Sequence, residues 1–349
     1  SSLGGTETQV LSLAVLNGKL YAGTATNGRV YSTGLGSFLN YTPHAFEALN
    51  ADNTTNNWVY STVSPDGLAS TKVYVPIVFA TNVTEGGVVG AGCMNVTTNT
   101  TLVNNINKNY TYSNISANQA CINITGSNLT FDCNNYWITG YNQEGSTAIW
   151  TNGTNVAIKN CNIQNFSVAV YSKGNYTTVY NNTLNVPANS TVNSQWWQGI
   201  WLNSSWFGNV SNNVITNVSA NYYAGDSAPT YPSGILLYTA QNSTVSGNNV
   251  TTTGRYALGV YLFTSSNWNS IPSNAIPTNG STGYGVYLNS LCSYNTVSFN
   301  NVTTNNADAA VVHVTSSSFN NISSNTISAR GSSGYGVYLV SSSSNNTVS

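Results

Sequence analysis

Short apolar segments with alternating apolar and polar positions recur along most of the chain. The sequence Gly-Val-Tyr-Leu at Gly285–Leu288 returns at Gly336–Leu339, and looser copies begin at Gly199, Gly234 and Gly259. Alternation with a period of two indicates half-buried β-strands, and no window of the sequence has a helical period. We therefore expect each unit to hold two or three short strands, separated by turns rich in Gly, Ser and Asn.

Each of these units also carries an Asn shortly after a β-branched residue. The Asn positions are 31, 35, 26, 26 and 25 residues apart. A unit this short cannot bury its apolar face alone and must stack on its neighbours. Stacked units place parallel strands about 4.8 Å apart, so that the Asn amides form an internal hydrogen-bonded ladder. The ladder residues are Asn182, Asn213, Asn248, Asn274, Asn300 and Asn325.

This pattern predicts an all-β fold, a right-handed parallel β-helix whose coils hold about 22–35 residues. The first 90 residues do not follow it. Residues 16–31 predict a β-hairpin with an Asn-Gly turn, and Lys72–Phe79 predicts a strand that Pro76 confines to a sheet edge. We therefore divide the chain into a β-rich segment, 1–90, and a β-helix, 91–349. We favour the first segment as a cap on the β-helix; the alternative is an arm that pairs with a neighbouring subunit.

Only 5% of the residues are charged and the net charge is −1, whereas an ordinary soluble domain has about 25% charged residues. Nucleic-acid binding requires a basic surface, which this composition excludes. No apolar run is long enough to span a membrane. The chain begins at Ser1 and contains one Met, Met94, as expected of a secreted product without its signal peptide; a fragment is the alternative. The final coil stops at Ser349 without a polar cap, so we expect the protein to continue or another element to stack there.

Many Asn residues lie in Asn-X-Ser/Thr sequons, the acceptor sequences for N-glycosylation. In several of them the middle residue is apolar, as in Asn249-Val-Thr and Asn301-Val-Thr. If this residue points into the core, strand alternation turns the Asn outward. None of the ladder Asn residues lies in a sequon. The candidate glycosylation sites are Asn82, Asn95, Asn109, Asn114, Asn123, Asn128, Asn165, Asn175, Asn209, Asn217, Asn242, Asn249, Asn301 and Asn321.

From about Cys93 to the end, the chain resembles the NosD-like and pectate-lyase-like parallel β-helix repeat proteins, especially the many-copy versions in archaeal surface proteins. The repeated segments carry this resemblance, together with Leu102–Ile106 and Cys121–Cys133, which look like the opening coils. The resemblance implies the fold but no particular activity, because lyases, hydrolases, epimerases, adhesins and spikes share it.

The cysteines suggest bridges between coils. The intervals from Cys93 to Cys121 and from Cys133 to Cys161 are both 28 residues, close to one coil. Adjacent coils bring Cα atoms to about 5 Å, which suits a disulfide. We favour Cys93–Cys121 and Cys133–Cys161 bridges, formed in an oxidising compartment. Buried free thiols and a Cys121–Cys133 bridge are the alternatives, and Cys292 is expected to be a free thiol.

Catalytic residues are hard to find. Enzymes on this fold use paired carboxylates, or carboxylates around Ca²⁺ with a basic residue. The acids of the helical part, Asp132, Glu144, Asp226 and Asp308, fall on different coils. Asp308 and His313 share a coil, but no Lys or Arg joins them. We therefore expect no enzymatic activity and no catalytic residues.

The copper role implied by a NosD-like resemblance would require clustered Met, His or Cys ligands. The chain has only Met94 and two distant histidines, His44 and His313. No Cys pair has the spacing of a zinc site. We expect neither a metal nor a cofactor.

Outward positions on the first strand of successive units form a row that is mostly aromatic. Exposed rings bind sugars or pack against another protein; the alternative is cross-strand stacking that stabilises the coils. The row contains Trp201, Leu236, Tyr261, Tyr287, His313 and Tyr338.

These features predict a non-catalytic extracellular protein, a heavily N-glycosylated subunit of a cell-surface filament, surface layer or stalk that assembles with identical copies. The alternative is a carbohydrate-binding or adhesive module that uses the aromatic row. The third and weakest interpretation is an extracellular polysaccharide lyase or hydrolase.

Overall fold

The computed structural model describes backbone and side chains for residues 93–107, 120–187, 197–219, 231–305 and 307–349, and the backbone of seven strands before residue 93. The chain folds as two compact units, Ser1–Thr81 and Asn82–Ser349.

The first unit contains two antiparallel sheets of three strands each. Leu16 pairs with Lys19 across the first two strands, and the second strand pairs with the third, as the hairpin prediction required. The strand that ends at Pro76 lies at the edge of its sheet, as expected. The strands are β1 (Val10–Leu16), β2 (Lys19–Thr24), β3 (Val30–Gly34), β4 (Asn50–Ala51), β5 (Asn57–Thr62) and β6 (Thr71–Pro76).

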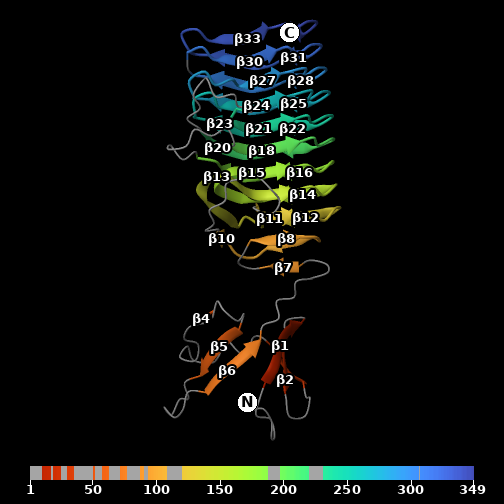
Figure 1. Cartoon of the computed structure of the whole chain (residues 1–349), viewed down its shortest axis with the longest axis vertical. Helices are drawn as coiled ribbons and strands as arrows, with labels where there is room; N and C mark the ends of the chain where they lie inside the picture. The colour runs from red at the N-terminus through yellow and green to blue at the C-terminus, as the bar shows by residue number, and fades with distance from the viewer. Residues whose placement is uncertain are drawn as a thin grey trace. The chain divides into compact units, whose positions relative to one another are not determined.

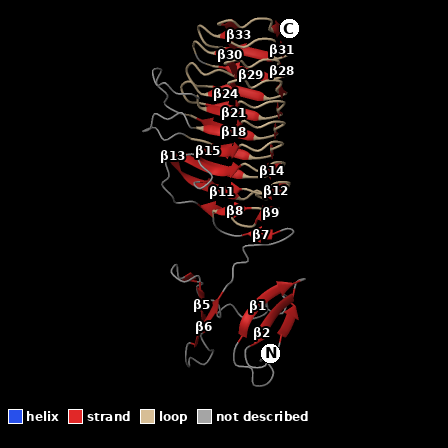
Figure 2. Ribbon diagram, turned by 45° about the vertical axis from the view of Figure 1, so that its right-hand side comes forward, coloured by secondary structure: helices blue, strands red, loops and turns tan. Residues whose placement is uncertain are grey.

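The second unit is a stack of coils whose strands all pair in parallel (Figure 1). A typical coil has three strands, as in β18 (Gln198–Asn203), β19 (Asn209–Ser211) and β20 (Val214–Val218). First and third strands share one 17-stranded sheet, and middle strands form an 11-stranded sheet (Figure 2). No helix occurs among the described residues. The predicted right-handed parallel β-helix is therefore confirmed.

The remaining strands of the larger sheet are β8 (Met94–Val96), β10 (Ile106–Asn107), β11 (Ala120–Ile124), β13 (Trp137–Thr151), β15 (Asn162–Ser172), β17 (Thr183–Asn185), β21 (Ser233–Tyr238), β23 (Asn249–Thr252), β24 (Leu258–Phe263), β26 (Ala275–Thr278), β27 (Val286–Asn289), β29 (Asn301–Thr304), β30 (Ala310–Thr315), β32 (Thr326–Ala329) and β33 (Tyr335–Val340). Those of the smaller sheet are β7 (Gly87–Val89), β9 (Thr100–Leu102), β12 (Leu129–Asp132), β14 (Val156–Lys159), β16 (Thr178–Tyr180), β22 (Thr244–Ser246), β25 (Ser270–Pro272), β28 (Thr296–Ser298), β31 (Asn321–Ser323) and β34 (Thr347–Val348). Because β7 pairs with β9, the parallel sheet begins before residue 91, where the sequence placed its start.

Columns of apolar side chains fill the interior. One of them joins Val210 to Val245 across β19 and β22, and another joins Val297 to Ile322 across β28 and β31; all four residues are buried. Each such side chain contributes about 1.5–3 kcal/mol through burial.

The Asn residues that the sequence placed in a ladder do form one. Asn248 is 1% exposed; its side-chain Nδ2 and its backbone N both donate to Oδ1 of Asn274, each at 2.9 Å. The same Nδ2 donates to the carbonyl of Val210 at 2.9 Å. Equivalent bonds run from Asn182 through Asn213 to Asn248, and from Asn274 through Asn300 to Asn325. The ladder thus satisfies carbonyls that the turn would otherwise bury without a partner.

A second Asn ladder, which the sequence analysis missed, follows the first strand of the later coils. Nδ2 of each residue donates to Oδ1 of the next at 3.0–3.1 Å. The members are Asn269, Asn295, Asn320 and Asn346. The later coils are therefore fastened at two turns. We call these the first turn, between the first and middle strands, and the second turn, between the middle and third strands.

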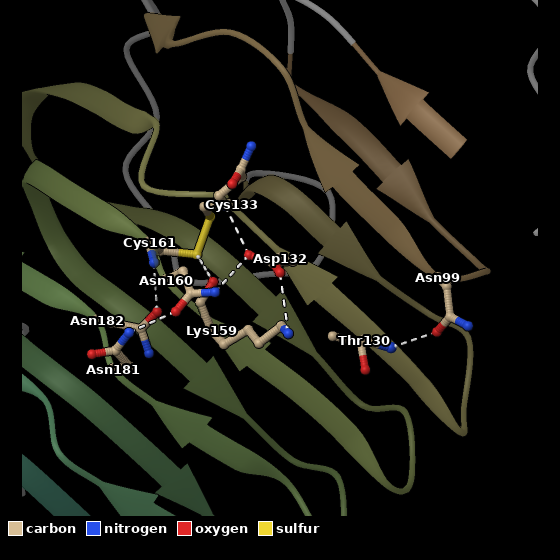
Figure 3. Close-up of polar contacts among 10 residues, drawn as sticks. Asn99, Thr130, Asp132, Cys133, Lys159, Asn160, Cys161, Asn181 and Asn182 are labelled. Carbon is tan, nitrogen blue, oxygen red and sulfur yellow. Dashed lines mark hydrogen bonds and ion pairs between the residues drawn. A yellow bond between two sulfur atoms is a disulfide. The ribbon is translucent and has the colours of Figure 1, made fainter. Parts of the chain in front are cut away.

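Two disulfides join neighbouring early coils. Cys93 bonds to Cys121 and Cys133 to Cys161, with Cα atoms 4.4 and 4.7 Å apart. These are the pairings that the 28-residue intervals favoured. Cys292 is a buried free thiol. Figure 3 shows that the first Asn ladder meets the second bridge: Oδ1 of Asn182 accepts the backbone N–H of Cys161 at 2.9 Å.

Candidate functional site

The predicted aromatic row has the expected parallel register but is not an open surface. Trp201, Tyr261, Tyr287 and His313 are only 1–8% exposed, and Tyr338, in the last coil, is 38% exposed. The interpretation of the row as an exposed binding surface is therefore wrong. The strand alternation does turn these side chains outward, but other aromatic residues pack over them. The covering side chains are Tyr231, Tyr238, Phe263 and Tyr284.

Within this covered row the rings stack from coil to coil. The ring centres of Tyr261 and Tyr287 are 5.1 Å apart with planes 7° from parallel, and those of Tyr287 and His313 are 4.7 Å apart. Burial raises the pKa of both tyrosines above the ordinary value. Cross-strand stacking, the alternative that the sequence left open, describes the row.

His313 is a packing residue in this environment. Its ring lies between Tyr287 and Tyr338, and Nε2 is 3.1 Å from the Thr315 hydroxyl, whereas the buried Nδ1 has no partner among the described residues. Burial lowers the pKa of His313 to about 4, so the ring is neutral at pH 7. Asp308 lies in an exposed turn and forms no ion pair with it within the described coils.

The acids are dispersed over the β-helix. Asp132 and Lys159 pair across β12 and β14 at 3.1 Å, next to the Cys133–Cys161 bridge (Figure 3). Burial raises the pKa of Asp132, but hydrogen bonds from the Asn134 backbone and the Asn160 side chain, together with Lys159, bring it below the ordinary value. Asp226 lies outside the described residues. Within the described ranges, no three His, Cys, Asp or Glu side chains form a group that could hold a metal.

The exposed feature that the sequence analysis missed is a column of aromatic side chains at the first turn. Its rings are 44–53% exposed and stack face to face in two blocks. Ring centres are 5.0 Å apart in the first block and 5.5 and 5.2 Å apart in the second, with planes 5–11° from parallel. We call this set the turn column; its members are Tyr176 and Phe207, then Trp268, Tyr294 and Phe319.

Each member of the turn column has a left-handed backbone conformation, with φ between 56° and 60°. Bulky side chains avoid this region, at a cost of about 1–2 kcal/mol per residue. A face-to-face pair recovers about 0.5–1.5 kcal/mol. With five strained residues and three stacked pairs, stacking compensates for only part of the strain. The aromatic residues are therefore not the most stable choice for this turn.

A gap separates the two blocks of the turn column. The backbone register aligns Phe207 with Asn242, and Asn242 with Trp268. Asn242 has the same left-handed conformation, with φ 53°, and its side chain is exposed. One signal in the sequence could have revealed the second block: an aromatic-Asn pair precedes the middle strand three times, at Trp268, Tyr294 and Phe319.

The structure separates the sequon Asn residues from the ladder Asn residues. Asn82, Asn109 and Asn114 lie outside the described part of the chain. Asn123 and Asn165 are half-buried. The remaining candidates are exposed: Asn95, Asn128, Asn175, Asn209, Asn217, Asn242, Asn249, Asn301 and Asn321.

Some of the sequon side chains are already engaged. The amide nitrogens of Asn123 and Asn217 donate to the side chains of Asn95 and Asn185. Nδ2 is the atom that carries an N-glycan, so these two sites are less available for modification.

Comparison with known proteins places part of this chain near one family. Residues 190–349 match the family described as periplasmic copper-binding protein (NosD). No curated protein sequence matches the chain significantly.

The two disulfides indicate that the protein folds outside the cytoplasm. No described helix could cross a membrane.

Several solved structures share the β-helical architecture. DFA-IIIase from Arthrobacter chlorophenolicus A6, in complex with GF2, is 11% identical with a TM-score of 0.47; the match covers 72% of this chain and 63% of that one. The Dettilon tailspike protein is 13% identical with a TM-score of 0.46, over 74% of this chain and 60% of that one. Endopolygalacturonase I from Stereum purpureum, complexed with galacturonate, is 14% identical with a TM-score of 0.41, over 76% and 93%.

The described residues do not fit a copper site of the kind the matching family's description suggests. Cys292 lies in the inner core at the first turn, where burial raises its pKa to about 12, whereas His313 lies in β30 and packs in the outer aromatic row. The one methionine, Met94, lies outside the matched segment. These side chains offer no cluster of soft ligands.

Proposed function

We propose that this chain is a non-catalytic structural element of a cell surface, a β-helix that displays N-glycans and assembles with identical copies. The observation that carries the proposal is the opposite placement of adjacent Asn residues. Asn248 and Asn300 are buried in the ladder, whereas Asn249 and Asn301, the next residues, are exposed and lie in sequons. One residue type thus builds the interior and offers attachment points outside.

The surface chemistry supports the same proposal. With 5% charged residues, the solubility of the β-helix depends on Asn, Ser and Thr, and hydrophilic glycans would add to it. The ladders and the disulfides fasten neighbouring coils to one another. A cell-surface element requires this combination of rigidity and polar surface more than it requires a reactive site.

Glycopeptide mass spectrometry of the natively purified protein tests glycan display. We expect glycans at Asn209, Asn249, Asn301 and Asn321, which are exposed and whose side chains make no hydrogen bond within the described residues. Asn217 serves as the internal comparison, because its Nδ2 is engaged, and we expect lower occupancy there. If none of these sites is modified, the glycan-display proposal fails.

Electron microscopy of the same preparation tests assembly. Ordered filaments or sheets, with residues 1–90 contacting a neighbouring subunit, would support a structural role and the arm interpretation. Isolated single chains at high concentration would contradict self-assembly and favour the cap. Turnover of an acidic polysaccharide in the presence of Ca²⁺ would contradict the non-catalytic assignment.

The turn column favours a second candidate, a carbohydrate-binding or adhesive module, because exposed aromatic rings bind sugars. We would compare saccharide binding of the native protein with that of Trp268→Ala. Phe299→Ala is the matched control, because Phe299 is also an exposed aromatic residue in a left-handed turn but stacks on no ring among the described residues. Loss of binding in Trp268→Ala alone would favour this second function.

A further inference from the structure

The gap in the turn column lies at Asn242, between the rings of Phe207 and Trp268 on the two adjacent coils. Phe207 stacks on Tyr176 with one ring face, so its other face is directed toward the coil of Asn242. Trp268 stacks on Tyr294, so its free face is directed toward the same coil from the opposite side. Two ring faces therefore border a slot whose floor is Asn242.

The width of the slot suits one ring-shaped group. Phe207 and Trp268 lie two coils apart, which corresponds to about 9.6 Å at the spacing of parallel strands. Groups that stack on aromatic faces prefer centre-to-centre separations of about 4.5–7 Å. A single six-membered ring at the middle of the slot would lie about 4.8 Å from each aromatic ring, within the preferred range on both sides.

Asn242 is suited to hold such a ring. It begins the sequon Asn242-Ser243-Thr244. Its backbone N–H donates to the carbonyl of Asn267 at 3.2 Å, whereas its side chain is exposed and its side-chain amide makes no hydrogen bond within the described residues. The side chain is shorter than its aromatic neighbours, so a sugar linked to Nδ2 would lie at the level of the rings.

We infer that the first pyranose of an N-glycan on Asn242 packs between Phe207 and Trp268, so that the glycan completes the turn column. This inference rests on the proposed glycan display and adds a structural role for one glycan. The cross-strand partners of Asn209, Asn249, Asn301 and Asn321 on the adjacent coils are not aromatic, so their glycans would extend into solvent.

A double-mutant cycle on the full, natively expressed protein tests the inference. Thr244→Val removes the sequon but keeps Asn242, and the Thr244 hydroxyl makes no described hydrogen bond. Trp268→Ala removes one wall of the slot. If the sugar packs against Trp268, Thr244→Val lowers Tm by about 2–4 °C in the parent chain and by clearly less in the Trp268→Ala chain. If the Trp268→Ala variant does not fold, Phe207→Ala, which removes the opposite wall, takes its place in the cycle.

Thr251→Val supplies the control cycle, because it removes the sequon of Asn249, whose partners on the two adjacent coils are Val214 and Ala275 and not aromatic residues. Its effect and that of Trp268→Ala should add. Additive effects in the Asn242 cycle would overturn the sandwich. Glycopeptides that show Asn242 bare, with Asn209 and Asn249 modified, would overturn the inference and leave the proposed function standing. If every sequon is bare, both fail.

Discussion

The first and second turns have nearly the same backbone but very different surfaces. At each turn a left-handed residue precedes a buried position that carries a ladder Asn in the later coils. At the second turn the left-handed residues include Asn181, Asn212, Gly247, Ser273, Phe299 and Ser324, and only one of these six is aromatic. At the first turn five of the nine described left-handed residues that precede the buried position are aromatic, and the other four are Asn128, Asn155, Asn242 and Asn345. The backbone conformation alone therefore does not explain why aromatic residues occupy the first turn.

The ladders, in contrast, should be equivalent at the two turns. We expect Asn274→Ala and Asn295→Ala each to lower the free energy of unfolding by about 3 kcal/mol, because each leaves buried carbonyl and N–H groups without partners. Chemical denaturation of the two variants measures this. A large loss in one variant and none in the other would show that the two turns are not built alike.

Acid should distinguish the covered row from the turn column. His313 has a pKa of about 4 in the folded chain and an ordinary value of 6.5, so the unfolded chain binds the proton more readily between these values. Its contribution is fully present above pH 6.5 and is lost as the pH falls toward 4. After allowance for solvent screening, we expect a loss of about 1–2 kcal/mol.

The tyrosines around His313 do not titrate in this range, and Asp132, with its lowered pKa, is protonated only at lower pH. Thermal unfolding between pH 7 and 4 measures the loss, and His313→Phe, which keeps a ring in the row, should remove most of this slope. An unchanged slope would assign it to other groups.

The smallest expected changes in the free energy of unfolding distinguish the cost of left-handed backbone strain from the gain of aromatic stacking. Phe299→Asn should stabilise the protein by about 0.5–1 kcal/mol, because it relieves backbone strain and breaks no ring contact. Tyr294→Asn relieves the same strain but loses two stacked neighbours, so we expect a change near zero or a slight loss. Equal stabilisation in both variants would mean that the stacks contribute nothing.

The sequence predicted the features that recur in successive coils, but not those that depend on contacts between distant segments. The first ladder is visible in the spacing of Asn182 to Asn325 because each coil in this range contributes one Asn. The second ladder begins only at Asn269; the aligned earlier positions are Thr177, Gly208 and Ser243, so the column is not continuous in the sequence.

Alternation correctly turned Tyr261 and Tyr287 outward. It could not show that Tyr231 and Tyr284, from other segments, would cover them. The left-handed conformation of Trp268 could not be predicted, because local preferences argue against it at a bulky residue.

The hydrogen bonds between the side-chain amides of each ladder all run in one direction, since every Nδ2 donates to Oδ1 of the following coil. Each ladder Asn therefore accepts a hydrogen bond from the preceding coil and donates one to the following coil. Every coil of the ladder thus presents the same donor and acceptor to its neighbours. Tandem duplication of the coding sequence for one coil, about 25 residues, would lengthen the protein without requiring compensating changes in the other coils. The length of such a protein can then vary in evolution while its cross-section stays constant.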